Sequence, residues 1–169
     1  MGLWDVLPDS ERQLWTLDPL HSVGPLRFGM PSGEVSAALE GCAPGLESGT
    51  AFRSYPEDVG VELHYDEDER LWAVSVDALR GPQVQVDGMP LVGRVPSELE
   101  DWLFERAESR GLRTDVFYLP GAQAGSNTLG VVLCMQRAGD RLLTRPVFLP
   151  AEAMGDVHHM LPQEAWDHV

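Results

Sequence analysis

Lysine is absent from this sequence of 169 residues, and positive charge is scarce: all 12 bases are arginine, against 27 acidic residues. The formal net charge at pH 7 is therefore −15. A surface of this sign repels the phosphates of nucleic acids and anionic lipids, because both bind proteins through basic side chains. We therefore expect no nucleic acid and no membrane among the partners. The same charge either keeps the protein soluble or favours a basic protein partner.

Cysteines, signal-peptide features and long apolar runs are also scarce or missing. The two cysteines, Cys42 and Cys134, are fewer than a secreted disulfide scaffold of this size usually carries. The first residues have neither a basic nor an apolar region, so they do not predict a signal peptide. No apolar run approaches the roughly 20 residues that span a membrane. We therefore expect a cytoplasmic protein with reduced thiols. Arginine in place of lysine is typical of a GC-rich genome such as that of an actinobacterium.

Motifs for catalysis and metal binding are missing as well. The sequence has no Gly-x-Ser-x-Gly elbow, no P-loop and no Gly-x-Gly-x-x-Gly loop. His158, His159 and His168 lie among carboxylates near the C-terminus, but their spacing fits no zinc motif. Cys42 and Cys134 lie in apolar surroundings, where a thiol behaves as a small hydrophobic group. We expect no catalytic residue, no metal site and no cofactor.

Hydrophobic residues are plentiful, at 43% of the chain, which is enough for one packed domain over residues 1–169. A lead-in helix is predicted within residues 1–22, because Asp9-Ser10-Glu11 is typical of a helix start. The apolar residues expected to dock this helix on the body are Leu14, Trp15 and Leu17. Residues 151–169 are expected to form a partly helical C-terminal arm.

Residues 23–88 form the first of two predicted units. A short extended piece, 25–28, leads through a turn at Gly29 into a helix that begins near Pro31 or Ser32, where proline is tolerated. The helix has an apolar face with i, i+3, i+4, i+7 spacing: Val35, Ala38, Leu39 and Cys42. Strands follow, indicated mainly by alternating apolar and polar residues, at 51–55, 59–65, 72–76 and 82–87.

Residues 89–150 repeat this order and form the second predicted unit. Gly93 takes the place of Gly29, and a second helix begins at Pro96. The face of this helix carries Leu99, Trp102, Leu103 and Arg106. Strands are predicted at 114–119, 129–136 and 141–149, and residues 121–127 are expected to be a mobile connection. The order indicates a tandem repeat. The predicted fold class is α+β, with two tandem helix-plus-antiparallel-meander units forming one domain and the helices packed on an antiparallel sheet.

The strongest candidate for a partner-binding surface is an acidic hairpin tip with a tryptophan close behind it. The five predicted partner-binding residues are Asp66, Glu67, Asp68, Glu69 and Trp72. The four carboxylates lack the glycine and the distal glutamate of an EF-hand loop, so they do not predict a Ca²⁺ site. The tip is either a solvated turn or a docking point for a basic partner. Tryptophan is enriched at binding hot spots.

Residues 24–31, with the sequence Gly-Pro-Leu-Arg-Phe-Gly-Met-Pro, are followed by Glu34-Val35. This segment resembles the Gly-Met-x-x-x-x-Val helix start of BamE/SmpA-like domains. Two such units in one chain also resemble the β-lactamase inhibitory protein, a tandem-repeat binder from actinobacteria. Both resemblances imply helices packed against a small antiparallel sheet. This sequence shows neither the lipid-attachment cysteine of the first family nor the disulfide-bonded, secreted character of the second, so no functional residue is carried over.

Three functions stay open. The first is a non-enzymatic protein-binding or inhibitory module, most concretely a cytoplasmic immunity protein that neutralises a toxin, because the same unit is similar to actinobacterial immunity-type proteins. The second is a small-ligand-binding protein or an enzyme with a pocket between sheet and helices. The third is a structural or regulatory protein. The acidic charge and the missing catalytic motifs favour the first.

Overall fold

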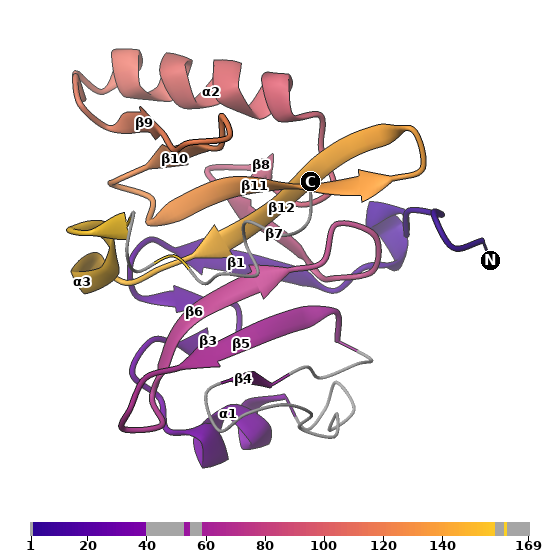
Figure 1. Ribbon diagram of the computed structural model, residues 1–169, viewed down its shortest axis with the longest axis vertical. Helices are drawn as coiled ribbons and strands as arrows, with labels where there is room; N and C mark the ends of the chain where they lie inside the picture. The colour runs from indigo at the N-terminus through magenta and orange to yellow at the C-terminus, as the bar shows by residue number, and fades with distance from the viewer. Residues whose placement is uncertain (1, 40–52, 55–58, 158–160, 162–169) are drawn as a thin grey trace.

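The computed structural model describes residues 2–39, 53–54, 59–157 and 161. In these residues the chain forms an α+β fold with three α-helices and two sheets rich in antiparallel pairs, which confirms the α+β part of the predicted fold class (Figure 1). No helix in this described part of the chain is long and apolar enough to cross a membrane.

The larger sheet has seven strands in the order β4-β5-β6-β12-β11-β10-β9, and all neighbouring pairs are antiparallel. Its strands are β4 (Arg53–Ser54), β5 (Val61–Tyr65), β6 (Leu71–Val76), β9 (Val116–Tyr118), β10 (Ala124–Ser126), β11 (Val131–Ala138) and β12 (Arg141–Phe148). Two hairpins, β5–β6 and β11–β12, meet where β6 pairs with β12. The strands predicted at 59–65, 72–76, 129–136 and 141–149 are therefore confirmed, with small shifts at their ends.

The smaller sheet has five strands in the order β3-β2-β1-β7-β8. Its strands are β1 (Leu14–Asp18), β2 (Ser22–Val23), β3 (Leu26–Arg27), β7 (Gln83–Val86) and β8 (Met89–Pro90). The pair β1·β7 is parallel, and the other pairs are antiparallel. The hairpins β2–β3 and β7–β8 therefore flank β1, one on each side.

The lead-in helix predicted within residues 1–22 is wrong. Only a single 3-10 turn, η1 (Asp9–Glu11), forms there, and residues 14–18 are strand β1. Burial alternates along β1, with Trp15 and Leu17 buried between exposed neighbours, which is the period of a strand. The partner that makes this segment a strand is β7, about 70 residues later in the chain, so local sequence does not reveal it.

The helices begin as predicted after their turn glycines. Helix α1 (Ser32–Ala38) buries Val35, and α2 (Pro96–Ser109) starts with proline in its first turn and buries Leu99 and Leu103. Helix α3 (Ala151–Met154) is a single turn at the start of the predicted C-terminal arm. Several predicted features lie outside the described residues. They are Cys42, which was expected on the apolar face of the first helix, and the three histidines of the C-terminal arm, His158, His159 and His168.

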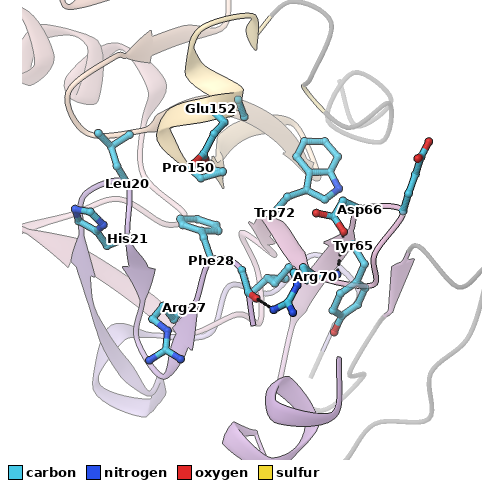
Figure 2. A pocket seen from close by; sticks show the side chains of 14 residues that line it. Leu20, His21, Arg27, Phe28, Tyr65, Asp66, Arg70, Trp72, Pro150 and Glu152 are labelled. Atoms are coloured by element: carbon cyan, nitrogen blue, oxygen red, sulfur yellow. Dashed lines mark hydrogen bonds between the residues drawn. The ribbon is translucent and has the colours of Figure 1, made fainter. Parts of the chain in front are cut away.

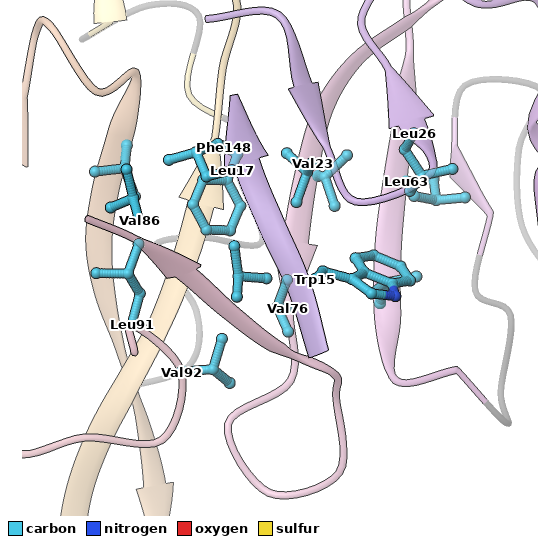
Figure 3. Packing of buried hydrophobic residues seen from close by; sticks show 14 of the residues in the cluster. Trp15, Leu17, Val23, Leu26, Leu63, Val76, Val86, Leu91, Val92 and Phe148 are labelled. Atoms are coloured by element: carbon cyan, nitrogen blue, oxygen red, sulfur yellow. The ribbon is translucent and has the colours of Figure 1, made fainter. Parts of the chain in front are cut away.

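The main core fills the space between the two sheets. Trp15, Leu17 and Val23 from the smaller sheet pack into one cluster with Leu63, Val76 and Phe148 from the larger sheet (Figure 3). Helices α1 and α2 join the same cluster through Val35, Leu39, Leu99 and Leu103. A second cluster lies on the opposite face of the larger sheet, beneath α3: Ala73, Leu119, Val132, Cys134, Val147, Leu149, Ala153 and Leu161.

The connection expected at residues 121–127 contains strand β10, which pairs with both β9 and β11. Gly125 permits this arrangement, because a Cβ atom there would lie 2.4 Å from the ring of Phe117. The buried carboxylate of Asp115 accepts hydrogen bonds from the Ser126 hydroxyl (2.6 Å) and the Thr128 amide (2.7 Å). The segment was expected to be mobile because of its small and polar residues. It forms a strand because Gly125 leaves room for Phe117 and because the buried Asp115 carboxylate accepts hydrogen bonds from it.

The two halves of the chain share an order of elements: a hairpin, a turn glycine, a helix and a meander. Gly29 and Gly93 both have positive φ, at 91° and 68°, and each lies three residues before its helix. The smaller sheet ends in β3 on one side and β8 on the other, the strands that precede these glycines. The tandem repeat stays a prediction, since strand lengths and surfaces differ between the halves.

Candidate functional site

An open groove with a volume of about 680 Å³ lies between four segments that come from three distant regions of the sequence. The segments are the turn before β2, the end of β3, the β5–β6 hairpin and the start of α3 (Figure 2). The groove is lined by Leu20, His21, Arg27, Phe28, Gly29, Tyr65, Asp66, Glu67, Arg70, Leu71, Trp72, Pro150, Glu152 and Ala153. We call this site the open groove.

Three of the five predicted partner-binding residues line the open groove: Asp66, Glu67 and Trp72. Asp68 and Glu69 belong to the same exposed hairpin tip but do not line the groove. These three residues therefore form one wall of the open groove, and their role in partner binding stays a prediction. The other walls come from segments that show no functional motif in the sequence.

Asp66 organises the hairpin tip. Its Oδ1 accepts hydrogen bonds from the backbone amides of Asp68 (2.9 Å) and Arg70 (3.0 Å), which is the usual way an aspartate closes a turn. Glu69 has φ of 57°, in the left-handed region where hairpins of this kind usually place glycine. One acidic residue therefore holds the tip in shape, and another occupies a strained position.

Arg70 connects the hairpin to the turn before α1. Its Nη1 donates to the carbonyl of Gly29 at 2.9 Å, although the side chain is exposed. Two backbone hydrogen bonds join the same turn to β6. The Gly29 amide donates to the Leu71 carbonyl, and the Leu71 amide donates to the Met30 carbonyl, both at 2.8 Å. The base of the groove is therefore held by main-chain hydrogen bonds, and Arg70 keeps donor atoms that face solvent.

Two half-buried aromatic residues form apolar walls of the groove. Figure 2 shows Phe28 and Trp72 among the side chains that line the groove. Phe28 also packs partly against the main core, and Trp72 packs partly against the second cluster. The ring centroid of Trp72 lies 6.2 Å from that of His64, which is buried behind it. Phe28 went unnoticed in the sequence because nothing local distinguishes it from a core phenylalanine.

Leu20 forms another wall from a strained backbone. It occupies the third position of a turn closed by the hydrogen bond from the His21 amide to the Asp18 carbonyl (3.0 Å), with φ of 70°. Glycine usually takes this position, because a side chain costs about 1–2 kcal/mol there. The Leu20 side chain packs directly over Gly130, where an added Cβ would lie only 2.5 Å from it. Strained residues of this kind cluster at functional sites.

A buried ionic cluster lies behind Trp72 on the same face of the larger sheet. Arg145 Nη2 lies 2.9 Å from Glu62 Oε1, and His64 Nε2 lies 3.7 Å from Glu62 Oε2. Nearby Cys134 is buried as expected. Burial raises the pKa of Cys134 to about 12, and the positive charge of Arg145 offsets only part of this shift. The thiol is therefore protonated at neutral pH and is not poised to act as a nucleophile.

The open groove combines aromatic and aliphatic walls with exposed carboxylates, such as Asp66 and Glu152, and exposed arginines, Arg27 and Arg70. Among the described residues, no group of three or more His, Cys, Asp or Glu side chains is arranged to hold a metal ion. Such a surface suits a ligand that has an apolar part and separate charges.

The resemblance to BamE/SmpA-like domains and to the β-lactamase inhibitory protein stays a prediction. Helices packed against antiparallel strands are present, as both resemblances imply. That arrangement is common to many unrelated proteins, so it does not assign a function. The chain matches no protein-family model, no curated protein sequence and no solved structure.

Proposed function

We propose that this protein is a non-enzymatic protein-binding module and that the open groove contacts the partner. The observation that carries this proposal is the groove itself, in which Asp66, Glu67 and Trp72 meet Phe28 and Arg70. A half-buried tryptophan beside charged groups is the composition of a binding hot spot. The strain at Leu20 supports the same proposal, because it places an apolar wall at the cost of local stability.

The most concrete form of the proposal is a cytoplasmic immunity protein that neutralises a toxin. The net charge of −15 supports a basic partner, since opposite charge speeds encounter between proteins. Long-range attraction would act over the whole surface, whereas the groove would select the segment that docks. Inhibition in this scheme needs only coverage of the partner's surface, and no catalytic residue.

A photo-crosslinking amino acid at position 67 or 152 tests the proposal in cells of the source organism. We expect one protein to be captured at both groove positions and to be inhibited by the free module. The exposed residue Glu108 on α2 is the control position, where the same capture should not occur. Trp72→Ala should reduce capture at least ten-fold while the melting temperature shows that the domain is still folded. Capture that is equal at position 108, or unchanged by Trp72→Ala, would contradict the proposal.

A second candidate is small-ligand binding, and the volume of the groove favours it. About 680 Å³ lies within the range of roughly 300–1,000 Å³ that is typical of small-molecule sites. Native mass spectrometry of gently purified protein tests this candidate. A bound mass that disappears in Trp72→Ala would support it, and protein without any bound mass would count against it.

A further inference from the structure

The second half of the chain contains the same framework as the open groove. In the first half, Gly29 donates to Leu71 and Leu71 donates to Met30. In the second half, the Gly93 amide donates to the Thr144 carbonyl, and the Thr144 amide donates to the Arg94 carbonyl, both at 2.9 Å. Each turn glycine is therefore joined in the same way to the last strand of its own meander. This equivalence rests on the hydrogen bonds alone and does not require a common origin of the halves.

The walls around the two glycines also correspond. The open groove is bounded by residues after β12, residues before β2 and the tip of the β5–β6 hairpin. Near Gly93 lies the loop 77–82, which follows β6 and precedes β7: a Cβ added at Gly93 would lie 2.7 Å from the Ala78 carbonyl. Ala78 and Leu79 of this loop pack against Ala138 and Leu143 of the β11–β12 hairpin, which forms the other wall. The two sites lie at opposite ends of the larger sheet, with α3 at one end and the N-terminus at the other (Figure 1).

The site around Gly93 is filled by residues 4–12 of the chain, which we call the N-terminal segment. Val6 packs against a small buried cluster that belongs to these walls: Ala78, Leu79, Ala138 and Leu143. The Leu7 amide donates to the Leu79 carbonyl at 2.8 Å. We call this site the filled groove.

Charged side chains fasten the N-terminal segment at its far end. The guanidinium of Arg12 is buried and donates to the carbonyls of Ala78 and Gly81, both at 2.7 Å. The carboxylate of Asp9 lies 2.6 Å from Arg94, the residue that follows Gly93. An apolar residue therefore enters the filled groove, and a carboxylate three positions later reaches an arginine beside the turn glycine.

From this correspondence we propose that the open groove binds an extended peptide segment of the partner protein, with an apolar side chain between Phe28 and Trp72 and a carboxylate three residues later on Arg70. The apolar surface of the open groove comes from Phe28, Trp72 and Leu20, whereas that of the filled groove comes from Ala78, Leu79, Ala138 and Leu143, so the two surfaces are similar in character and not residue by residue. By the backbone hydrogen bonds, Met30 takes the position of Arg94, so Arg70 reaches the turn glycine from the other side, through its hydrogen bond to the Gly29 carbonyl (2.9 Å). Arg70 is exposed and keeps donors for a carboxylate beside Gly29.

A partner segment fits this site better than a second copy of the chain does. The N-terminal segment of each copy is already held in its own filled groove by Arg12, and two copies with a net charge of −15 repel each other. The inference rests on the proposed protein-binding function. The partner can be basic overall, because the charge of the docking segment is a local property.

The full chain and a peptide with the sequence of residues 3–9, Leu-Trp-Asp-Val-Leu-Pro-Asp, acetylated and amidated, provide the test. Titration followed by amide NMR should shift the signals of Gly29, Arg70 and the Trp72 indole. The Val6→Asp form of the peptide should bind at least ten-fold more weakly, because it loses the apolar anchor. The Asp9→Asn form should bind about two- to five-fold more weakly, and this difference should vanish in the Arg70→Ala protein.

Arg141→Ala is the matched control, since Arg141 is an exposed arginine at the other hairpin. It should leave peptide binding unchanged, whereas Trp72→Ala should weaken binding at least ten-fold. No binding at millimolar peptide would overturn the inference, as would shifts at Ala78 and Leu143, which would show that the peptide replaces the chain's own segment. Failure of the peptide together with successful crosslinking from position 67 would leave the protein-binding function standing and reject only the extended-segment mode.

Discussion

The filled groove and the open groove share a backbone framework but differ in what covers it. In the filled groove the walls are small and aliphatic, and residues 4–12 of the same chain close it. In the open groove the corresponding space is lined by Phe28, Trp72 and Arg70 and is accessible from solvent. Residues of the same chain therefore close the filled groove, whereas no described residue covers the open groove.

The hairpin tips beside the two grooves also differ in the residue that takes the left-handed backbone conformation. Gly139 provides the left-handed residue at the tip of β11–β12, with φ of 66°. Glu69 occupies the left-handed position at the tip of β5–β6. At the filled groove the left-handed position is therefore occupied by glycine, which has no steric penalty there. At the open groove, Glu69 and Leu20 adopt the same left-handed conformation with backbone strain.

The largest expected effect concerns the arginines of the two grooves. Arg12→Ala should lower the free energy of unfolding by about 3–4 kcal/mol, because it leaves buried carbonyls without donors and releases the N-terminal segment. Arg70→Ala should cost less than about 1 kcal/mol, because this side chain is exposed. Urea denaturation of both variants measures the difference. Equal losses would break the distinction between a structural and a free groove.

Burial lowers the pKa of Arg12, while Asp9 and Asp77 act in the opposite direction. The guanidinium still carries its charge at all ordinary pH values. Arg12→Lys is therefore an informative companion variant, since it keeps a charge but loses the planar set of donors. It should recover only a minor part of the stability that Arg12→Ala loses.

The wall formed by Leu20 and Gly130 gives the next largest effect. Gly130→Ala should cost about 2–4 kcal/mol, because the new Cβ would lie 2.5 Å from Leu20 and 2.6 Å from the Leu149 carbonyl at φ of 65°. Gly111→Ala is the matched control, as Gly111 has φ of 67° but no atom within 4 Å of its added Cβ. It should cost only about 1 kcal/mol. Thermal unfolding that shows equal costs would mean that Leu20 does not press on this wall.

The next effect concerns Cys134, which is fully buried in the second cluster on the larger sheet. In a Cys42→Ser variant, Cys134 is the remaining thiol, and it should not react with Ellman's reagent at pH 8 until the protein unfolds. Its pKa is raised to about 12 in the folded protein, whereas an unfolded thiol ionises near pH 8.5. The unfolded state therefore loses its proton first, so stability should fall as pH rises above about 8.5, by up to about 1.4 kcal/mol per pH unit. Cys134→Ala should remove this dependence on pH.

The smallest expected effect concerns the hairpin tips. Glu69→Gly should raise the free energy of unfolding by about 0.5–1 kcal/mol, because relief of the left-handed strain outweighs the extra freedom of glycine in the unfolded chain. The opposite change at the other tip, Gly139→Ala, should lower it by about 1 kcal/mol. Chemical denaturation of the two variants checks the signs. A loss of stability in Glu69→Gly would show that Glu69 makes a contact that compensates for its backbone.

Much of the fold could be predicted from local patterns. Alternation of apolar and polar residues located β5, β6, β11 and β12, and the pairs Gly29–Pro31 and Gly93–Pro96 marked the starts of α1 and α2. Strand β1 was missed because its partner β7 lies far along the chain, and a short apolar segment carries too little periodicity to exclude a helix.

The candidate site was predicted in part. Asp66, Glu67 and Trp72 stood out because they are close together in the sequence and unusual in type. Phe28, Leu20 and Pro150 did not stand out, since each becomes a wall only when three distant segments meet. The filled groove was hidden for the same reason, because the role of Val6 depends on the loop 77–82 and the β11–β12 hairpin.

The sequence by itself determined the strongly acidic charge, the α+β class, and the turns and helix starts at Gly29 and Gly93. These properties follow from composition and from short-range steric preferences, which act between neighbours in the chain. Only the tertiary structure decided that residues 4–12 close the filled groove, whereas no residue in the described part of the chain closes the open groove. That choice depends on long-range packing and on the buried hydrogen bonds of Arg12, whose partners are more than 60 residues away.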